Sequence, residues 1–156
     1  MSYKFVVDFM LGRLCRWLRV IGYDAEYFTP ADKNLLVYNA LRNDRIVLTR
    51  DTKLSRKKTL RIILVSSNDF IEQIKQIVHE VPLEIDEKCF FTRCSLCNVV
   101  LEETDKAGIV EKVPSYVYKT QEMFSVCPNC KKIYWQGSHW ELMKNTIKKI
   151  EGIDNV

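Results

Sequence analysis

The chain has 156 residues, of which 47% are hydrophobic and 28% charged, and its formal net charge is +4. This length suits one moderate domain, or a smaller domain joined to a metal-stabilised module. Because no segment approaches the roughly 18 uninterrupted apolar residues of a membrane helix and charged residues interrupt any N-terminal signal, we expect a cytoplasmic protein without a membrane partner.

The first half of the chain alternates strand and helix patterns. Short runs rich in apolar residues predict four strands, at residues 4–8, 25–28, 45–49 and 61–65. Apolar residues that recur every three or four positions predict three helices, at residues 10–21, 32–44 and 68–80. Strands written as nearly continuous apolar runs and separated by helices favour an α/β fold, with a mostly parallel sheet flanked by helices.

Aspartates stand where several of these elements end or begin. Asp8 ends the first strand, Asp51 follows the third, and Asp32 opens the second helix. Because ligands of open parallel sheets collect at the carboxyl ends of the strands, we expect these three carboxylates to converge there. Such oxygen clusters suit Mg²⁺ or Mn²⁺, which assist phosphodiester hydrolysis. The alternative for Asp32, and more so for Asp69, is a helix N-cap.

Basic residues gather near the same edge of the predicted sheet. Arg13, Arg16 and Arg19 lie opposite the apolar side of the first helix, and no acidic residue accompanies them. We expect these arginines, together with Arg50, to hold phosphate groups. Residues 1–80 carry 14 Lys and Arg against 9 Asp and Glu. The loop after the third strand adds three candidate contacts to a polyanion, Arg56, Lys57 and Lys58, although a solvated basic loop is the alternative.

The second half contains short β-like pieces around two C-x-x-C pairs, followed by a predicted helix at about 139–150 with a capping box from Ser138 to Glu141. The pairs are separated by 29 residues and comprise Cys94, Cys97, Cys127 and Cys130. Four thiolates in this arrangement are typical of a structural Zn²⁺ site. Disulfides or redox dithiols are the alternative, which a cytosolic location disfavours.

Three other potentially reactive residues have simpler interpretations. Cys15 lies on the apolar side of the first helix, so we expect a core residue rather than a nucleophile. Cys89 does not share the paired spacing, and we interpret it as a strand residue. His139 follows Ser138 in the predicted last helix, where it contacts RNA or packs on the ribbon rather than completing a zinc site that already has four thiolates.

Five segments in this order resemble a known family along nearly the whole chain: DFMLGRLCRWLRVIGYD, DKNLL, RIVLTRD, RCSLCN and CPNCKKIYWQGSHW. The family is the PIN-like ribonuclease domain with a C-terminal zinc ribbon, named from the C terminus of the Mut-seven exonuclease and also found as stand-alone prokaryotic proteins. The resemblance implies a Rossmann-like PIN domain at 1–80, a zinc ribbon with a C-terminal helix at 81–156, and metal-dependent cleavage of RNA. It places Asp8, Asp32 and Asp51 on the acidic positions, Arg13 and Arg16 in the arginine-rich helix, and the four paired cysteines on the zinc ligands.

Two functions therefore compete. The first is a Mg²⁺- or Mn²⁺-dependent ribonuclease, most simply an endonuclease, acting on RNA that is free or ribosome-associated (ribosomal RNA or tRNA). The second is a catalytically weak or inactive RNA- or ribosome-binding factor on the same fold. In either case Tyr134 and Trp135 are candidate platforms for unpaired bases, or core residues of the ribbon. No P-loop and no G-x-S-x-G motif supports another chemistry.

Overall fold

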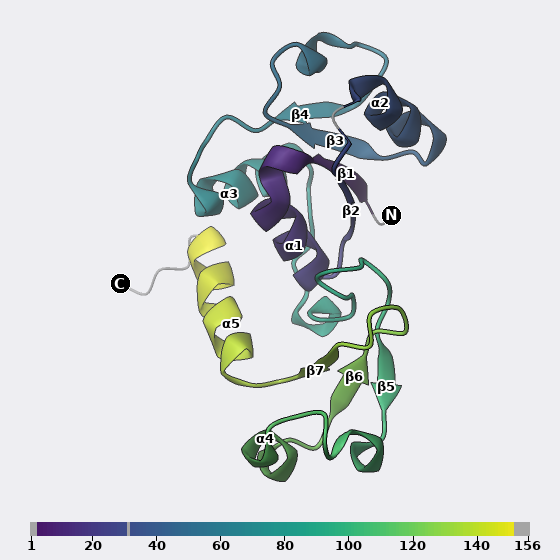
Figure 1. Cartoon of the computed structure of the whole chain (residues 1–156). Helices are drawn as coiled ribbons and strands as arrows, with labels where there is room; N and C mark the ends of the chain where they lie inside the picture. The colour runs from purple at the N-terminus through teal and green to yellow at the C-terminus, as the bar shows by residue number, and fades with distance from the viewer. Residues whose placement is uncertain (1–2, 31, 152–156) are drawn as a thin grey trace.

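The computed structural model describes residues 3–30 and 32–151. Its main sheet has four parallel strands in the order β2-β1-β3-β4 (Figure 1). The strands are β1 (Lys4–Asp8), β2 (Asp24–Phe28), β3 (Ile46–Thr49) and β4 (Ile62–Leu64). The predicted α/β fold with a mostly parallel sheet is confirmed.

Helices cover both faces of this sheet. They are α1 (Gly12–Val20), α2 (Lys33–Arg42) and α3 (Phe70–Glu80), joined by the distant α5 (Ser138–Ile150). Alternation along β1 sends Phe5 and Val7 into the core with α1, α3 and α5, and sends Val6 into a second core with α2. Helix α1 ends at Val20, and Gly22 lies just beyond its C-cap residue Ile21, with a φ of +100° that is a left-handed conformation favouring glycine.

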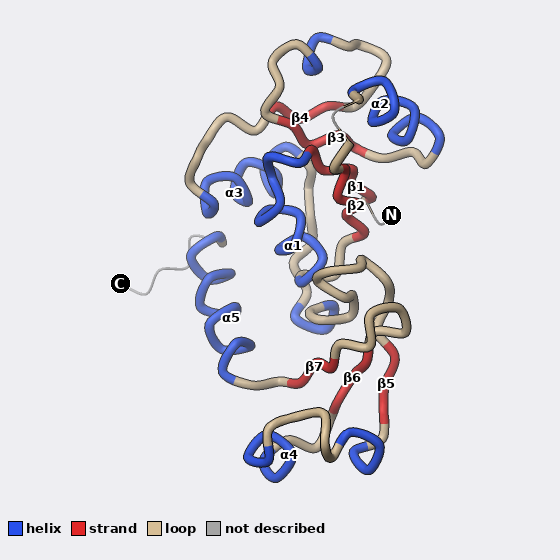
Figure 2. Tube along the Cα trace, in the orientation of Figure 1, coloured by secondary structure: helices blue, strands red, loops and turns tan. Residues whose placement is uncertain are grey.

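A smaller antiparallel sheet follows in the second half of the chain (Figure 2). It contains β5 (Glu102–Thr104), β6 (Phe124–Val126) and β7 (Ile133–Trp135), and α4 (Ser115–Thr120) precedes β6. The buried apolar cluster of this region consists of only four side chains: Ile109, Val113, Val117 and Phe124. None of the helices in the described ranges combines the length and apolar character needed to cross a bilayer.

Helix α5 returns from the small sheet to the main core. Its residues Ile147 and Ile150 pack into the same cluster as α1 and α3, and Figure 1 shows α5 running beside these helices. Two local predictions are wrong here. Ser138 is the first residue of α5 and not its cap, since Gly137 occupies the N-cap position without a side-chain bond. Cys89 lies in a short 3₁₀ turn (Glu87–Cys89) rather than in a strand.

Candidate functional site

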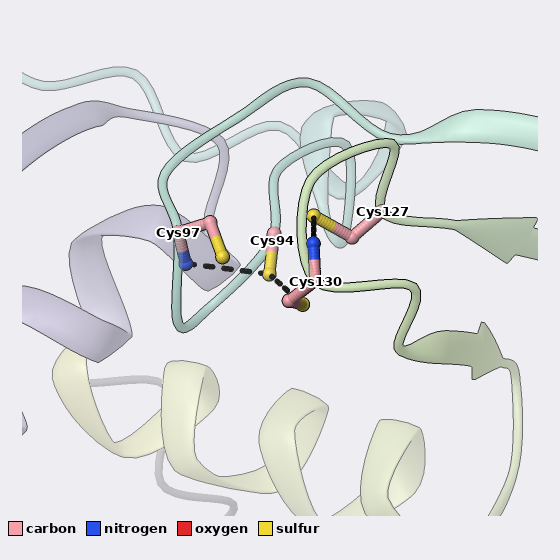
Figure 3. A group of neighbouring side chains, drawn as sticks. All are labelled: Cys94, Cys97, Cys127 and Cys130. Carbon is pink, nitrogen blue, oxygen red and sulfur yellow. Dashed lines mark hydrogen bonds between the residues drawn. The ribbon is translucent and has the colours of Figure 1, made fainter.

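Four cysteine side chains from two separate loops point toward one another (Figure 3). They are Cys94, Cys97, Cys127 and Cys130, and their sulfur atoms all lie within 4.8 Å of each other. A tetrahedral site with Zn–S bonds of about 2.3 Å requires sulfur atoms about 3.8 Å apart. The distance from Cys94 Sγ to Cys130 Sγ is 3.7 Å. This group could therefore hold a zinc ion.

The two loops have the same backbone design. In each loop the amide of the second cysteine donates to the sulfur of the first, from Cys97 to Cys94 and from Cys130 to Cys127. The residue after each pair has positive φ, +65° for Asn98 and +64° for Lys131. The repeated turn aims both thiols of each pair at one point, as expected for a pre-shaped thiolate site.

The hydroxyl of Tyr134 stands beside this cluster, with its oxygen 3.1 Å from Cys94 Sγ. Burial alone raises the pKa of Cys94, but hydrogen bonds with Tyr134 and with the amides of Cys97 and Leu96 outweigh burial and lower that pKa to about 6. Metal binding needs thiolates, and these hydrogen bonds favour the thiolate at Cys94, whereas at Cys130 a backbone hydrogen bond from Lys132 is outweighed by burial and the three neighbouring cysteines, which raise its pKa to about 11. Trp135 packs against the small apolar cluster. Trp135 is partly buried there, which favours the core interpretation for this residue, while the Tyr134 hydroxyl bonds to Cys94 and Ser95 of the cysteine loop.

Arg19 joins the first cysteine loop to the parallel sheet. Its guanidinium donates to the carbonyl oxygens of Ala25 in β2 and of Ser95 and Leu96 in the loop, at 2.7, 3.1 and 2.8 Å. The residue is only 6% exposed. The prediction that Arg19 lies on the outer face of the first helix is wrong, because its donors bind carbonyls inside the molecule. Arg19 is therefore a buried structural residue and not an exposed contact for RNA.

Asn98 makes a second connection at the same place. Its side chain donates to Asp24 Oδ1 at 2.7 Å and accepts from the amide of Ala25 at 3.0 Å. Asp24 also forms an ion pair with Arg45, whose Nη1 is 2.7 Å from Asp24 Oδ1. Burial raises the pKa of Asp24, but its hydrogen bonds with Arg45 and Asn98 outweigh burial and lower that pKa. Because Asn98 directly follows Cys97, the order of the cysteine loop is transmitted to the edge strand β2.

Replacing Arg19 tests this structural role. Arg19→Gln is expected to lower the free energy of unfolding by about 2–4 kcal/mol, because charge-assisted bonds to buried carbonyls are lost. Arg16→Gln, an exposed residue three positions earlier on the same helix, is expected to change it by about 0.5 kcal/mol or less. Urea denaturation followed by circular dichroism measures both. Equal stability of the two variants would contradict the assignment.

The acidic edge of the parallel sheet begins with Asp8 at the end of β1. Asp8 is 1% exposed, and each of its oxygens is used. Oδ1 accepts from the amide of Phe9 at 2.8 Å, and Oδ2 accepts from the Thr49 hydroxyl and from Lys33 Nζ, both at 2.7 Å. A buried carboxylate needs such compensation. The Asp8 carboxylate is thus buried and held by three hydrogen bonds at the carboxyl end of β1, one of the two central strands of the sheet.

Asp51 lies at the same edge, two residues after Thr49. Its Oδ1 accepts from the amides of Lys53 and Leu54, and its Oδ2 is 3.9 Å from Lys33 Nζ. The hydrogen bonds that the backbone N–H groups of Lys53 and Leu54 donate to Asp51 lower its pKa, and the nearby Lys33 ammonium lowers it further. Asp8 and Asp51 therefore face one shared cation. Carboxylate oxygens are the donors that Mg²⁺ or Mn²⁺ prefers, so these two residues could hold such an ion.

Asp32 has a different role in the structure. Its Oδ1 caps α2 by accepting from the amides of Asn34 and Leu35. Asp69 caps α3 in the same way, through the amide of Glu72. Both capping interpretations are confirmed. Within the described residues the four cysteines form the only group of three or more potential metal ligands with such short mutual distances, so Asp32, Asp8 and Asp51 are not grouped as tightly as the cysteines.

The remaining basic candidates are accessible. Arg13 and Arg16 are exposed on α1, and Arg13 stacks over the ring of Phe70 at 4.4 Å from its centroid. Arg50 binds the side chain of Asn68. A cavity of about 440 Å³ lies between them, lined among others by Arg13, Trp17, Arg50 and Phe70. The loop residues Arg56, Lys57 and Lys58 are all exposed, and the exposed His139 lies in the first turn of α5.

Sequence patterns did not single out Lys33 or Thr49. The Thr49 hydroxyl donates to Asp8 and accepts from the amide of Asp51 at 3.0 Å, so it fixes the two acidic segments relative to each other. Thr49 is the last residue of the otherwise apolar strand β3. A polar residue at the end of an apolar strand was the one feature of the sequence that could have indicated its role at this edge. Cys15 is buried, and burial raises its pKa to about 11. It is a core residue, as predicted.

Comparison with known proteins gives one family. The model of the Mut7-C RNAse domain matches residues 3–147, which include both the parallel sheet and the cysteine group. No curated protein and no solved structure matches the chain. The resemblance seen in the sequence is confirmed by the family match.

Proposed function

The chain belongs to the Mut7-C RNAse domain family, and from this membership and its acidic sheet edge we propose that it is a Mg²⁺- or Mn²⁺-dependent ribonuclease, most simply an endonuclease. Asp8 and Asp51 hold the ion, and Asp32 orients the end of α2 beside them. A divalent ion in such a site supplies a Lewis acid for the phosphodiester and an activated water.

The observation that carries this proposal is the shared cation between Asp8 and Asp51. The two carboxylates come from the ends of neighbouring parallel strands, at the edge where such sheets bind ligands. Both face Lys33 Nζ, at 2.7 and 3.9 Å. The carboxylate oxygens that pair with this ammonium are also the donor type that Mg²⁺ and Mn²⁺ prefer.

The chain's other residues bind and orient RNA. Arg13, Arg16 and Arg50 contact the phosphate backbone next to the acidic edge, and Arg56, Lys57 and Lys58 extend this surface along the loop that begins beside Asp51. The zinc-loaded ribbon is a structural module, and it positions RNA relative to the sheet. The substrate is an RNA, free or associated with the ribosome.

A cleavage assay tests the proposal. Zinc-loaded protein freed of other metals is mixed with labelled single-stranded, hairpin and tRNA substrates, and Mn²⁺ or Mg²⁺ is then titrated. We expect cleavage that depends on the added ion and is absent without it. Because a strong chelator also removes zinc, ion titration is a cleaner control than EDTA.

The second candidate is an RNA- or ribosome-binding factor without cleavage. The exposed basic loop at Arg56–Lys58 favours it, because this loop supplies affinity without chemistry. Tight, salt-sensitive binding with no cutting at any ion concentration would contradict the nuclease and support this factor. Its affinity would then fall, with a smaller salt dependence, when Arg56, Lys57 and Lys58 are neutralised.

A further inference from the structure

Lys33 occupies the place where the proposed metal would bind. Its ammonium is 2.7 Å from Asp8 Oδ2 and 3.9 Å from Asp51 Oδ2. It also lies over the ring of Phe9, 5.4 Å from the centroid, in a cation–π contact. The side chain of Lys33 is 30% exposed while that of Asp8 is 1% exposed. The ammonium therefore covers the buried carboxylate on its solvent side.

The backbone of Lys33 is held in position for this contact. Lys33 is the first residue of α2, and the neighbouring Asp32 caps the helix through the amides of Asn34 and Leu35. The lysine side chain thus starts from a fixed point at the edge of the sheet. Its long aliphatic stem leaves the ammonium free to swing toward solvent without moving the helix.

The charges explain why the lysine is bound there. Asp8 has two neutral donors, the Phe9 amide and the Thr49 hydroxyl, and neither neutralises a buried negative charge. Lys33 supplies the compensating positive charge. A divalent ion at the same oxygens would supply more charge, and an ammonium a few ångströms away would repel it.

We propose that Lys33 is a resident cation that a divalent metal ion must displace before it binds Asp8 and Asp51. This inference rests on the proposed metal-dependent function. Lys33 therefore sets the metal affinity of the site, which is empty of metal at low ion concentration and filled only when Mn²⁺ or Mg²⁺ outcompetes the ammonium.

Direct metal binding tests the inference without reference to cleavage. Mn²⁺ affinity is measured by electron paramagnetic resonance of free Mn²⁺ on zinc-loaded protein, for wild type, Lys33→Gln, Lys33→Arg and Lys75→Gln. Lys75 carries the same charge on α3 and pairs with Glu72, at 3.2 Å. We expect Lys33→Gln to bind Mn²⁺ at least about tenfold more tightly than wild type, while Lys33→Arg and Lys75→Gln stay within about threefold.

A double variant locates the ion. Adding Asp51→Asn to Lys33→Gln is expected to remove the gain in affinity, because one of the two carboxylates is lost. The inference is overturned if folded Lys33→Gln, checked by circular dichroism, binds Mn²⁺ no more tightly than wild type. It is also overturned if Lys33→Arg gains as much as Lys33→Gln, because the positive charge would then not be the cause.

The outcomes separate this inference from the proposed function. A wild-type protein that cleaves RNA with added Mn²⁺, together with an unchanged Mn²⁺ affinity in Lys33→Gln, would remove the role of Lys33 and leave the nuclease. A gain of affinity in Lys33→Gln without cleavage by any variant would support the displaced cation and contradict the nuclease.

Discussion

Removing zinc is expected to unfold the region around β5, β6 and β7. The apolar cluster there has only four buried side chains, too few to hold three short strands and a two-turn helix on their own. A structural zinc site contributes about 10–16 kcal/mol at neutral pH in small zinc modules. No rearrangement of these four side chains replaces a contribution of that size.

The effect is expected to reach beyond the cysteine loops. Arg19 and Asn98 connect the first loop to β2, so its loss leaves the Arg19 guanidinium with one of its three carbonyl partners. The parallel sheet keeps its own core of α1, α3 and α5. We therefore expect a partly folded protein with a lower melting temperature and a protease-sensitive segment within residues 92–136.

Matched cysteine variants give the sharpest measurement. Cys130→Ser is expected to lose zinc, as measured by elemental analysis, and to show the protease sensitivity of the chelated protein. Cys89→Ser changes an exposed cysteine outside the cluster, so it is expected to keep one zinc per chain and the wild-type melting curve. A chelated protein as protease-resistant as the zinc-loaded one would contradict a structural role for the metal.

The main fold could be predicted because each strand is a local pattern. The apolar runs of β1 and β3 bury every residue from Phe5 to Asp8 and from Ile46 to Thr49, and only a sheet covered on both faces buries whole strands in this way. The cysteine group was equally local in its signal, since two short spacings determined it. The spacing of apolar residues was therefore enough to predict the fold, and the spacing of the cysteines was enough to predict the metal-binding group.

Arg19 could not be placed correctly by such reasoning. On the helix it follows Arg13 and Arg16 at regular spacing, and nothing nearby marks it as buried. Its partners Ser95 and Leu96 lie more than 70 residues away, and they approach only after the cysteine loop docks on β2. Carbonyl groups that are brought together from distant parts of the chain cannot be recognised from the local sequence. An arginine that donates hydrogen bonds to them therefore cannot be distinguished from a surface arginine by its sequence neighbours.

Lys33 was missed for a related reason. A lysine in the first turn of a helix is an ordinary solvated residue, and it is slightly unfavourable there because of the helix dipole. Its position is explained only when the end of β1 brings Asp8 beneath it. A local feature that is unfavourable for the helix is thus compensated at the acidic edge, where strained or costly choices commonly mark a functional site.

Asp51→Asn is expected to abolish RNA cleavage while leaving the fold intact. The asparagine oxygen still accepts from the amides of Lys53 and Leu54, as Asp51 Oδ1 does, so we expect a melting temperature within about 2 °C of wild type. The oxygen that faces Lys33 becomes an amide nitrogen and can no longer bind a metal. Loss of a direct ligand is expected to lower the cleavage rate by at least about 100-fold, since supporting residues alone cost 10–100-fold.

Asp69→Asn is the control for this variant. Asp69 accepts from the amide of Glu72 at the start of α3, which is the same backbone role that Asp51 has, and asparagine caps helices as well as aspartate does. It has no ion pair with Lys33 among the contacts described, so we expect wild-type cleavage. RNA affinity of Asp51→Asn should equal or exceed that of wild type, because a negative charge near the phosphates is removed. Equal cleavage by wild type and Asp51→Asn would exclude Asp51 from the metal site, and loss of cleavage in Asp69→Asn would make Asp69 a further acidic residue of that site.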